Sequence, residues 1–441
     1  MKQSILFYLL GFLLLMPSVK AQSNRIEYTE YDLPNGLHVI LHQDKSTPIV
    51  SVSVMYHVGS KNERPDRTGF AHFFEHLMFE GTENIERGAY SKYVENAGGT
   101  LNANTSNDRT YYYEILPSNQ LELGLWLESE RMLHARVDSI GIKTQKGVVI
   151  EEKKQSYDNR PYGSLFEEVM KRAYKVHPYR WTVIGDPDHI RAAKDEDFLD
   201  FYKMFYVPNN ATLVIAGDIE MAKTKELVAQ YFNEIPKGAM SIYRPQVVEP
   251  PLNGEVRDTI FDNVQVPLVV QAYRAPKLGS DDFYALDMLS NLLSSGSSSR
   301  FHKALVDQQE KAMATGSFPV PFSDPGLIFT YAFTNMGVDA GDLENGMNAE
   351  IAKVQQELIS EREFAKLKNQ FENQIVASNQ RLASRAENLA TNYTYFKNSE
   401  LINKELDKYL SVTREDLKRV ANQYLVPANR VVLYYMPKNS K

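Results

Sequence analysis

The sequence predicts an α+β protein of two homologous halves, each a largely antiparallel sheet packed with helices. Two distant stretches carry this prediction, KDEDFLDFYKMFYVPNNATLVIAGD at 194–218 and TREDLKRVANQYLVPANRVVLYYMP at 413–437. They align without gaps, and three pairs of identical residues share one offset of 219: Asp197 and Asp416, Pro208 and Pro427, Asn210 and Asn429. A constant offset over this length indicates an internal duplication rather than chance similarity.

Each copy predicts a helix that opens with acidic residues, then a Pro-Asn turn and a strand of β-branched residues. The likeness extends to TPIVSVSVMYHVGS and VPLVVQAYRAPKLGS, two alternating strands that each lead into a helix. Neighbouring strands with long helices between them are typical of antiparallel α+β folds. We expect the halves at residues 22–235 and 256–441, joined by the proline-rich linker 236–255.

Composition excludes several classes of protein. The 441 residues are 43% apolar and 24% charged, which is ordinary for a globular chain and argues against disorder. The chain contains no cysteine, so disulfides, thiolate ligands and a cysteine nucleophile are excluded. A formal charge of −7 without a basic block gives no electrostatic reason to expect nucleic acid as a partner.

Residues 1–21 have the pattern of a secretory signal peptide. A charged start, an apolar run at residues 5–16 and small residues at Val19 and Ala21 lead to a cleavage point after Ala21. The run is short for a membrane span, although an uncleaved anchor is the alternative. An exported protein without disulfides suits a bacterial periplasm.

The stretch GFAHFFEHLMFEGT, residues 69–82, places two histidines and a glutamate within a run of phenylalanines. In a helix, His72 and His76 lie on one face, so both imidazoles can bind one metal ion. Glu75 precedes the second histidine and completes H-x-x-E-H, the order found in inverzincins. The alternative is core packing, because the phenylalanines are core residues in either interpretation.

A catalytic zinc site needs a third protein ligand and one position open for water. The candidate segment is KGVVIEEKKQSYDN, residues 146–159, where an apolar stretch leads into a helix with adjacent carboxylates at Glu151 and Glu152. The residues alone hardly separate these two glutamates, since either could be solvated. A site of two histidines and a glutamate also takes manganese or cobalt.

These motifs resemble the insulinase and pitrilysin family of zinc peptidases, and in particular its short members of the mitochondrial processing peptidase type. The resemblance covers nearly all of the chain after residue 21. It includes NGLHVILHQDKSTPIVSVSVMYHVGS, TGFAHFFEHLMFEGT, NAGGTLNANTSNDRTYYYE, KGVVIEEKKQSYDNRPYG and FYVPNNATLVIAGD. The family's distal ligand follows the second histidine by about the distance from His76 to Glu152, so the resemblance selects Glu152 over Glu151.

The resemblance implies one Zn²⁺ per chain, held by His72, His76 and Glu152. Zinc lowers the pKa of a bound water and polarises the scissile carbonyl, and Glu75 is then expected to act as the general base and pass the proton to the leaving amine.

The resemblance also implies a binding strand for an extended peptide at GGTLNANT, residues 98–105. Its expected substrate-binding residues are Asn102, Ala103 and Asn104. The alternative is an ordinary hairpin edge, since Gly, Asn and Thr also mark turns.

Three positions depart from the family pattern. An acidic residue often found seven positions before the distal ligand is Gln145 here, so a supporting carboxylate is missing. The Arg and Tyr with which related second halves hold substrate are replaced by Val306 and Met313, which cannot make those hydrogen bonds. We therefore expect a heterodimer with a related zinc-less chain that supplies Arg and Tyr, with a homodimer as the alternative.

The sequence thus predicts an exported zinc endopeptidase that cleaves peptides or unfolded segments. The alternative is a non-catalytic structural or assembly subunit, since the same fold serves as a scaffold in respiratory complexes. The complete set of His72, Glu75, His76 and Glu152 argues against a remnant site. A further, weaker alternative is a peptidase devoted to one maturation substrate rather than to general peptide degradation.

Overall fold

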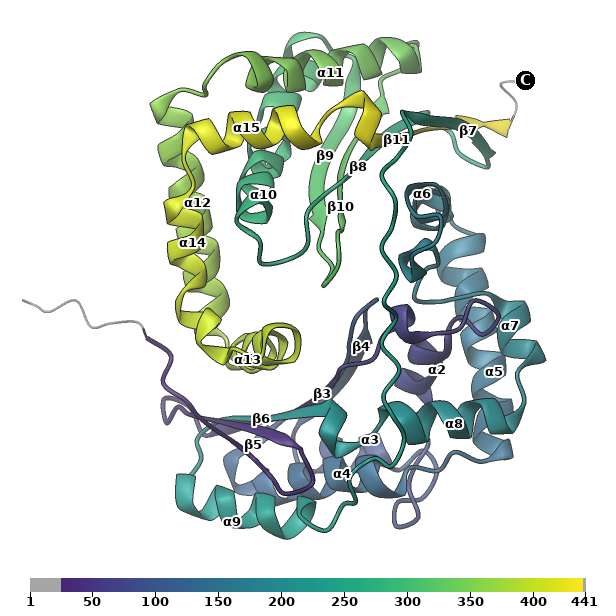
Figure 1. The fold of residues 1–441 in the computed structure, drawn as a ribbon, viewed down its shortest axis with the longest axis vertical. Helices are drawn as coiled ribbons and strands as arrows, with labels where there is room; N and C mark the ends of the chain where they lie inside the picture. The colour runs from purple at the N-terminus through teal and green to yellow at the C-terminus, as the bar shows by residue number, and fades with distance from the viewer. Residues whose placement is uncertain (1–24, 439–441) are drawn as a thin grey trace, which may run out of the picture.

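The computed structural model describes residues 25–438 and contains two sheets that face each other across the molecule (Figure 1). The predicted signal peptide, residues 1–21, lies outside the described residues. The first sheet has the order β1-β2-β6-β3-β5-β4. Its strands are β1 Thr29–Asp32, β2 His38–Gln43, β3 Ile49–Tyr56, β4 Thr100–Thr105, β5 Thr110–Pro117 and β6 Ala211–Gly217.

The second sheet has the order β7-β11-β8-β10-β9. Its strands are β7 Val256–Asp262, β8 Leu268–Arg274, β9 Ala312–Val320, β10 Leu327–Thr334 and β11 Arg430–Pro437. One neighbouring pair in each sheet is parallel, β2 with β6 and β7 with β11, and the other pairs are antiparallel. This topology confirms the predicted α+β fold with largely antiparallel sheets.

The helices of the first half are α2 Phe70–Leu77, α3 Tyr90–Asn96, α4 Leu121–His134, α5 Ser139–Lys153, α6 Leu165–Ala173, α7 Pro187–Ala192, α8 Asp195–Phe205 and α9 Met221–Phe232. Those of the second half are α10 Asp281–Ser294, α11 Ala340–Gln356, α12 Glu361–Gln380, α13 Leu382–Phe396, α14 Glu405–Ser411 and α15 Arg414–Tyr424. Two π-helical segments occur at Lys154–Asp158 and His302–Gln308, the first directly after α5. In Figure 1, α4 and α9 cover the outer face of the first sheet, and α10, α11 and α15 pack on the second.

The duplicated residues perform the same task in both halves. Asp197 accepts a hydrogen bond from the backbone N–H of Lys194 at the start of α8, as Asp416 does from Thr413 at the start of α15. The matching asparagine amides each donate to the last turn of their helix, Asn210 to Phe205 O (2.8 Å) and Asn429 to Tyr424 O (2.9 Å). Each asparagine therefore supplies a donor to a carbonyl left free at a helix end, before the strand begins.

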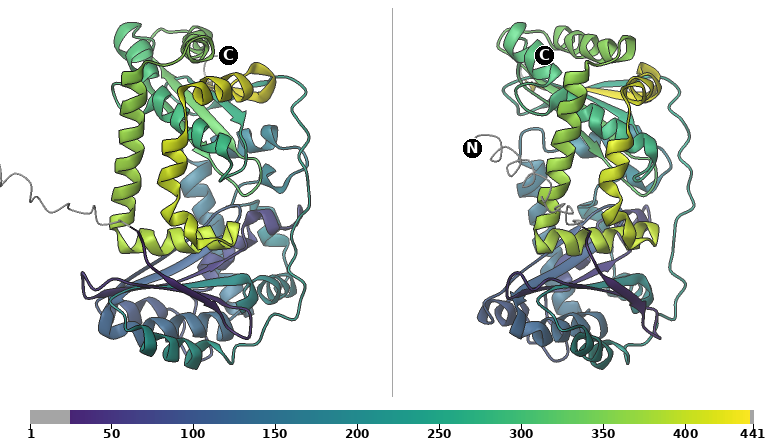
Figure 2. Two further views of the ribbon diagram at one scale, coloured as in Figure 1. Left: turned by 60° about the vertical axis from the view of Figure 1, so that its left-hand side comes forward. Right: turned by 90° about the vertical axis from the view of Figure 1, so that its left-hand side faces the viewer.

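The two halves exchange a helix. Apolar residues of α6, from the first half, pack on the second sheet in a cluster with Leu268, Phe329 and Leu433. In return α13 of the second half packs on the inner face of the first sheet, where Leu389 contacts the cluster of Met55. The predicted linker, residues 236–255, contains no helix or strand and runs along one side of the molecule (Figure 2).

A buried carboxylate ties α11 to the second sheet. Glu344 accepts two hydrogen bonds from Arg257 on β7 (2.7 and 2.8 Å), one from Arg430 on β11 (3.2 Å) and one from Tyr434. Burial raises the pKa of this carboxyl, but the hydrogen bonds from Arg257 and Tyr434 outweigh burial and hold the pKa at about 2. The ionised form is therefore the one that stabilises the fold.

We expect Glu344→Gln to destabilise the protein in a pH-dependent way. The folded pKa lies below the unfolded one, so the stabilisation is complete above about pH 4.3 and is lost as the pH falls toward 2. Urea unfolding should give a difference of roughly 3 kcal/mol between wild type and variant at pH 7, shrinking at acid pH. A difference that stays constant from pH 7 to pH 3 would contradict this account.

Candidate metal centre

Helix α2 separates a packing face from a polar face. Its residues Phe70, Phe73, Phe74 and Leu77 are fully buried, and Phe70 and Phe73 each lie with their ring 4.5 Å from that of Phe198 on α8. The spacing i, i+3, i+4, i+7 places these side chains on one side of the helix. His72, Glu75 and His76 therefore occupy the other side, and core packing and a polar site coexist on one helix.

The Nε2 atoms of His72 and His76 lie 3.3 Å apart. Glu152, one residue before the end of α5, brings its Oε2 to 3.6 Å from His72 Nε2 and to 3.2 Å from His76 Nε2. Within residues 25–438 this trio is the group of ligand-type side chains close enough to share a metal ion. The neighbouring Glu151 points elsewhere, toward Gln155 and Lys154.

This geometry fits a zinc ion. Zinc bonds of about 2.0–2.1 Å in a tetrahedron place neighbouring ligand atoms roughly 3.3–3.4 Å apart, close to the three distances between the donors. Glu152 Oε2 is buried without a hydrogen-bond donor. Burial and the neighbouring His76 lower the pKa of His72 to about 4, which keeps this imidazole in the neutral form that binds metals.

Glu75 stands beside this trio without belonging to it. Its Oε2 accepts a hydrogen bond of 2.6 Å from Thr105 Oγ1, at the end of β4. Burial raises the pKa of Glu75, and the hydrogen bond from Thr105 opposes that change. Such an environment suits a carboxylate that exchanges a proton. Sequence reasoning missed Thr105, although the residue lies in the stretch expected to bind substrate.

Strand β4 lies at the edge of the first sheet, and a free sheet edge is what an extended peptide needs to pair as an added strand. Its predicted binding residues are partly engaged within the chain. Asn102 Oδ1 accepts from the backbone N–H of Ala103 (2.8 Å), and the amide oxygen of Asn104 accepts from Arg109. Arg109 in turn donates to Glu387 on α13 (2.6 Å), so an incoming peptide competes for Asn104.

Comparison with known proteins decides the family. The model described as insulinase (peptidase family M16) matches residues 38–186, and the one described as peptidase M16 inactive domain matches residues 193–371. A protein named zinc protease PqqE from Helicobacter pylori is 30% identical over 423 residues, covering 95% of each chain. The chain belongs to the insulinase family of peptidases.

Other relatives of this insulinase-family chain agree in sequence and in fold. The mitochondrial-processing peptidase subunit beta of Blastocladiella emersonii is 25% identical over 413 residues, covering 92% of this chain and 88% of that protein. The crystal structure of a protease from Helicobacter pylori superposes with a TM-score of 0.89 at 29% identity, covering 94% of this chain and all of that one. Both the predicted family and the predicted two-part fold are confirmed.

The positions that depart from the insulinase-family pattern have clear places in the structure. Gln145 donates to Glu80 Oε1 (2.6 Å), a carboxylate in the turn that follows α2, and Nδ1 of His72 is buried without a hydrogen-bond partner. Val306 lies in the second π-helical segment and packs against the core of the second half. Met313 lies on the edge strand β9 with 60% of its surface exposed.

A residue outside every predicted motif fixes the start of α2 in this insulinase-family chain. Glu63 is buried, and its carboxylate accepts the backbone N–H groups of Gly69 (2.9 Å) and Ala71 (2.8 Å). These donors belong to the first turn, which has no intrahelical acceptor for them. Glu63 lies in an irregular stretch where no periodicity signals its role.

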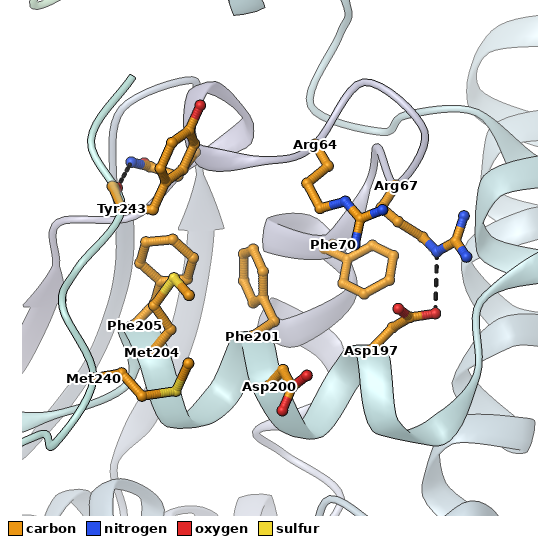
Figure 3. A pocket seen from close by; sticks show the side chains of 11 residues that line it. Arg64, Arg67, Phe70, Asp197, Asp200, Phe201, Met204, Phe205, Met240 and Tyr243 are labelled. Atoms are coloured by element: carbon orange, nitrogen blue, oxygen red, sulfur yellow. Dashed lines mark hydrogen bonds and ion pairs between the residues drawn. The ribbon is translucent and has the colours of Figure 1, made fainter. Parts of the chain in front are cut away.

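The chain also has a cavity of about 340 Å³ between α8, the start of α2 and the linker (Figure 3). Phe201, Met204 and Met240 form much of its wall, and Arg67 is paired with Asp197 at 3.1 Å. None of the residues expected to bind metal or substrate lines this cavity. The candidate site is therefore the cluster on the opposite, polar side of α2.

Proposed function

We propose that this chain is a zinc-dependent endopeptidase that cleaves peptides or unfolded segments. The observation that carries the proposal is the trio His72, His76 and Glu152 at tetrahedral spacing, with the unligated Glu75 beside it. The names of the relatives, which include zinc protease and mitochondrial-processing peptidase, support the same reaction class.

The chain's own residues account for the remaining requirements of hydrolysis. A zinc ion held by the trio would acidify a water molecule and polarise the scissile carbonyl. Glu75 takes the proton from that water and delivers it to the leaving amine. Thr105 fixes the Glu75 carboxylate, and the free edge of β4 holds the peptide extended by backbone hydrogen bonds, with Asn102, Ala103 and Asn104 at the point of contact.

We further propose that the active form is a two-chain chamber with a related zinc-less partner. The exposed Met313 and the partly buried Val306 occupy the places where hydrogen-bonding side chains are expected, so this chain supports substrate binding from its second half poorly. Full activity of the purified chain as a homodimer would refute this part of the proposal.

Export to a periplasm or a similar compartment is also part of the proposal. It rests on the signal-peptide pattern of residues 1–21. Within residues 25–438, no helix is both long and apolar enough to cross a membrane.

Metal content and cleavage together test the proposed function. We expect the purified chain to bind about one zinc ion, and a chelator to abolish cleavage of unfolded peptides until zinc is restored. Glu152→Gln should lose the metal, whereas Glu151→Gln should retain it, because Glu151 faces Lys154 and Gln155. Measurements should be made with and without any co-purifying homologue.

The non-catalytic alternative predicts the opposite result for both metal dependence and cleavage. A scaffold subunit would show no zinc-dependent cleavage alone or with its partner, and Glu152→Gln would change nothing but stability. Cleavage at the same rate with and without zinc would also refute the proposed function.

A further inference from the structure

The second half of the chain contacts the turn after β4, the strand beside the candidate metal centre, at a buried carboxylate as well as at the Arg109–Glu387 pair. Asp108 lies in the turn between β4 and β5 and is 2% exposed. Its Oδ1 accepts from Ser323 Oγ (2.6 Å), Tyr179 OH (2.7 Å) and Lys61 Nζ (2.9 Å). Its Oδ2 accepts from the backbone N–H of Ser323 (3.0 Å).

Ser323 belongs to the turn between β9 and β10 of the second half. The hairpins that end the two sheets therefore meet at this point, and Asp324 adds an ion pair with Lys61 at 3.1 Å. Four donors around one buried carboxylate make a network that is strong when complete and costly to break in part.

The Asp108 turn is tightly held on its other side as well. The backbone N–H of Lys61 donates to Asn107 O (2.8 Å), and that of Ser60 donates to Ser106 O (3.3 Å). A Cβ added at Gly59 would lie 2.4 Å from Ser106 O, so the two segments are in direct backbone contact. The turn therefore has little room to move while the network is intact.

The turn is short, and Thr105 is the residue that precedes it. The same four-residue connection, residues 106–109, carries Asp108 and leads directly to the hydroxyl that holds Glu75. Errors of about 1 Å in the position of a reacting group can lower a rate by roughly 100-fold.

We propose that Ser323 is a positioning residue for catalysis. It holds the β4–β5 turn through Asp108, and so fixes Thr105, the Glu75 carboxylate and the free edge of β4. This inference rests on the proposed function, and it gives the second half, part of which the inactive-domain model matches, an indirect role in positioning Glu75.

The test compares Ser323→Ala with two matched variants. Ser323→Thr keeps the hydroxyl and should retain activity. Ser164→Ala removes another hydrogen bond between the halves, Ser164 Oγ to Tyr435 OH at 3.0 Å, without contacting β4. We expect Ser323→Ala to lower kcat roughly tenfold with zinc content unchanged, and Ser164→Ala to leave kcat near that of wild type.

A double variant shows whether the effect passes through Thr105. Thr105→Val already releases Glu75, so adding Ser323→Ala should lower kcat by much less than it does in wild type. Equal losses in both backgrounds, or equal losses for Ser323→Ala and Ser164→Ala, would overturn the inference.

Hydrogen exchange tests the same inference without relying on cleavage. Amides of residues 100–109 should exchange faster in Ser323→Ala than in Ser164→Ala, because the first variant alone loosens the turn. If the wild type cleaves nothing, the proposed function fails, and this comparison still tests separately whether Ser323 holds the β4–β5 turn. Equal exchange in the two variants would refute it.

Discussion

Glu75→Gln is expected to abolish cleavage while leaving the metal in place. Glutamine keeps the shape of the side chain and an oxygen that can accept from Thr105, but it cannot take a proton from water. General-base catalysis contributes about 10²–10⁴-fold, so kcat should fall by at least that range for an unfolded peptide. The trio His72, His76 and Glu152 is untouched, so zinc content should equal that of wild type.

Glu151→Gln provides the matched control for this experiment. It removes a carboxylate one residue from Glu152, but its partners are Lys154 and Gln155 at the surface. Its kcat should stay close to that of wild type. An active Glu75→Gln enzyme would exclude Glu75 as the base, and loss of zinc from that variant would mean that Glu75 supports the metal instead.

Arg131→Met is expected to cause the largest loss of stability. Arg131, Glu128 and Glu114 have fully buried side chains in the first half. Arg131 donates to Glu128 at 2.7 Å, and its guanidinium lies 4.4 Å from the rings of Tyr90 and Tyr112. Removing this cation leaves a buried carboxylate unpaired, which costs about 3–5 kcal/mol, a large part of the 5–15 kcal/mol typical of a domain.

Glu114→Gln separates the cost of an unpaired buried charge from the cost of losing polar contacts. Burial and the charge of Glu128 raise the pKa of Glu114 well above its usual range, whereas Arg131 opposes the effect of burial on the pKa of Glu128, so we expect Glu114 to carry the proton of this pair. Glutamine reproduces the neutral side chain and its donor. Denaturant unfolding should therefore show a change within about 1 kcal/mol for Glu114→Gln, and a loss as large as that of Arg131→Met would contradict this assignment.

Local rules account for what the sequence predicts correctly. Helical spacing alone places His72 and His76 on one face, and the phenylalanines between them define the opposite face. The duplication is visible because Asp197 and Asn210 serve helix ends, where few residue types can substitute, and their counterparts in the second half do the same. Only the family resemblance identified the third donor, Glu152, because Glu151 and Glu152 are adjacent carboxylates that differ only in the direction in which each points from the helix.

Contacts between distant segments account for what the sequence does not predict. Thr105 acquires its role only when the end of β4 meets α2, and Arg109 bridges Asn104 and Glu387, which comes from the distant helix α13. Gln145 makes its hydrogen bond to Glu80, which comes from the segment after α2. No local sequence pattern predicts these contacts, because each depends on how elements far apart in sequence pack.

The exchange of α6 and α13 bears on how such a chain could arise. A half on its own would expose both its sheet face and its exchanged helix, whereas two copies paired as a domain-swapped dimer would bury them. Gene fusion would then have converted a domain-swapped dimer into one chain, with residues 236–255 as the join. The two copies could afterwards diverge, with the candidate metal centre in one of them, because neither could be lost without exposing the other's core.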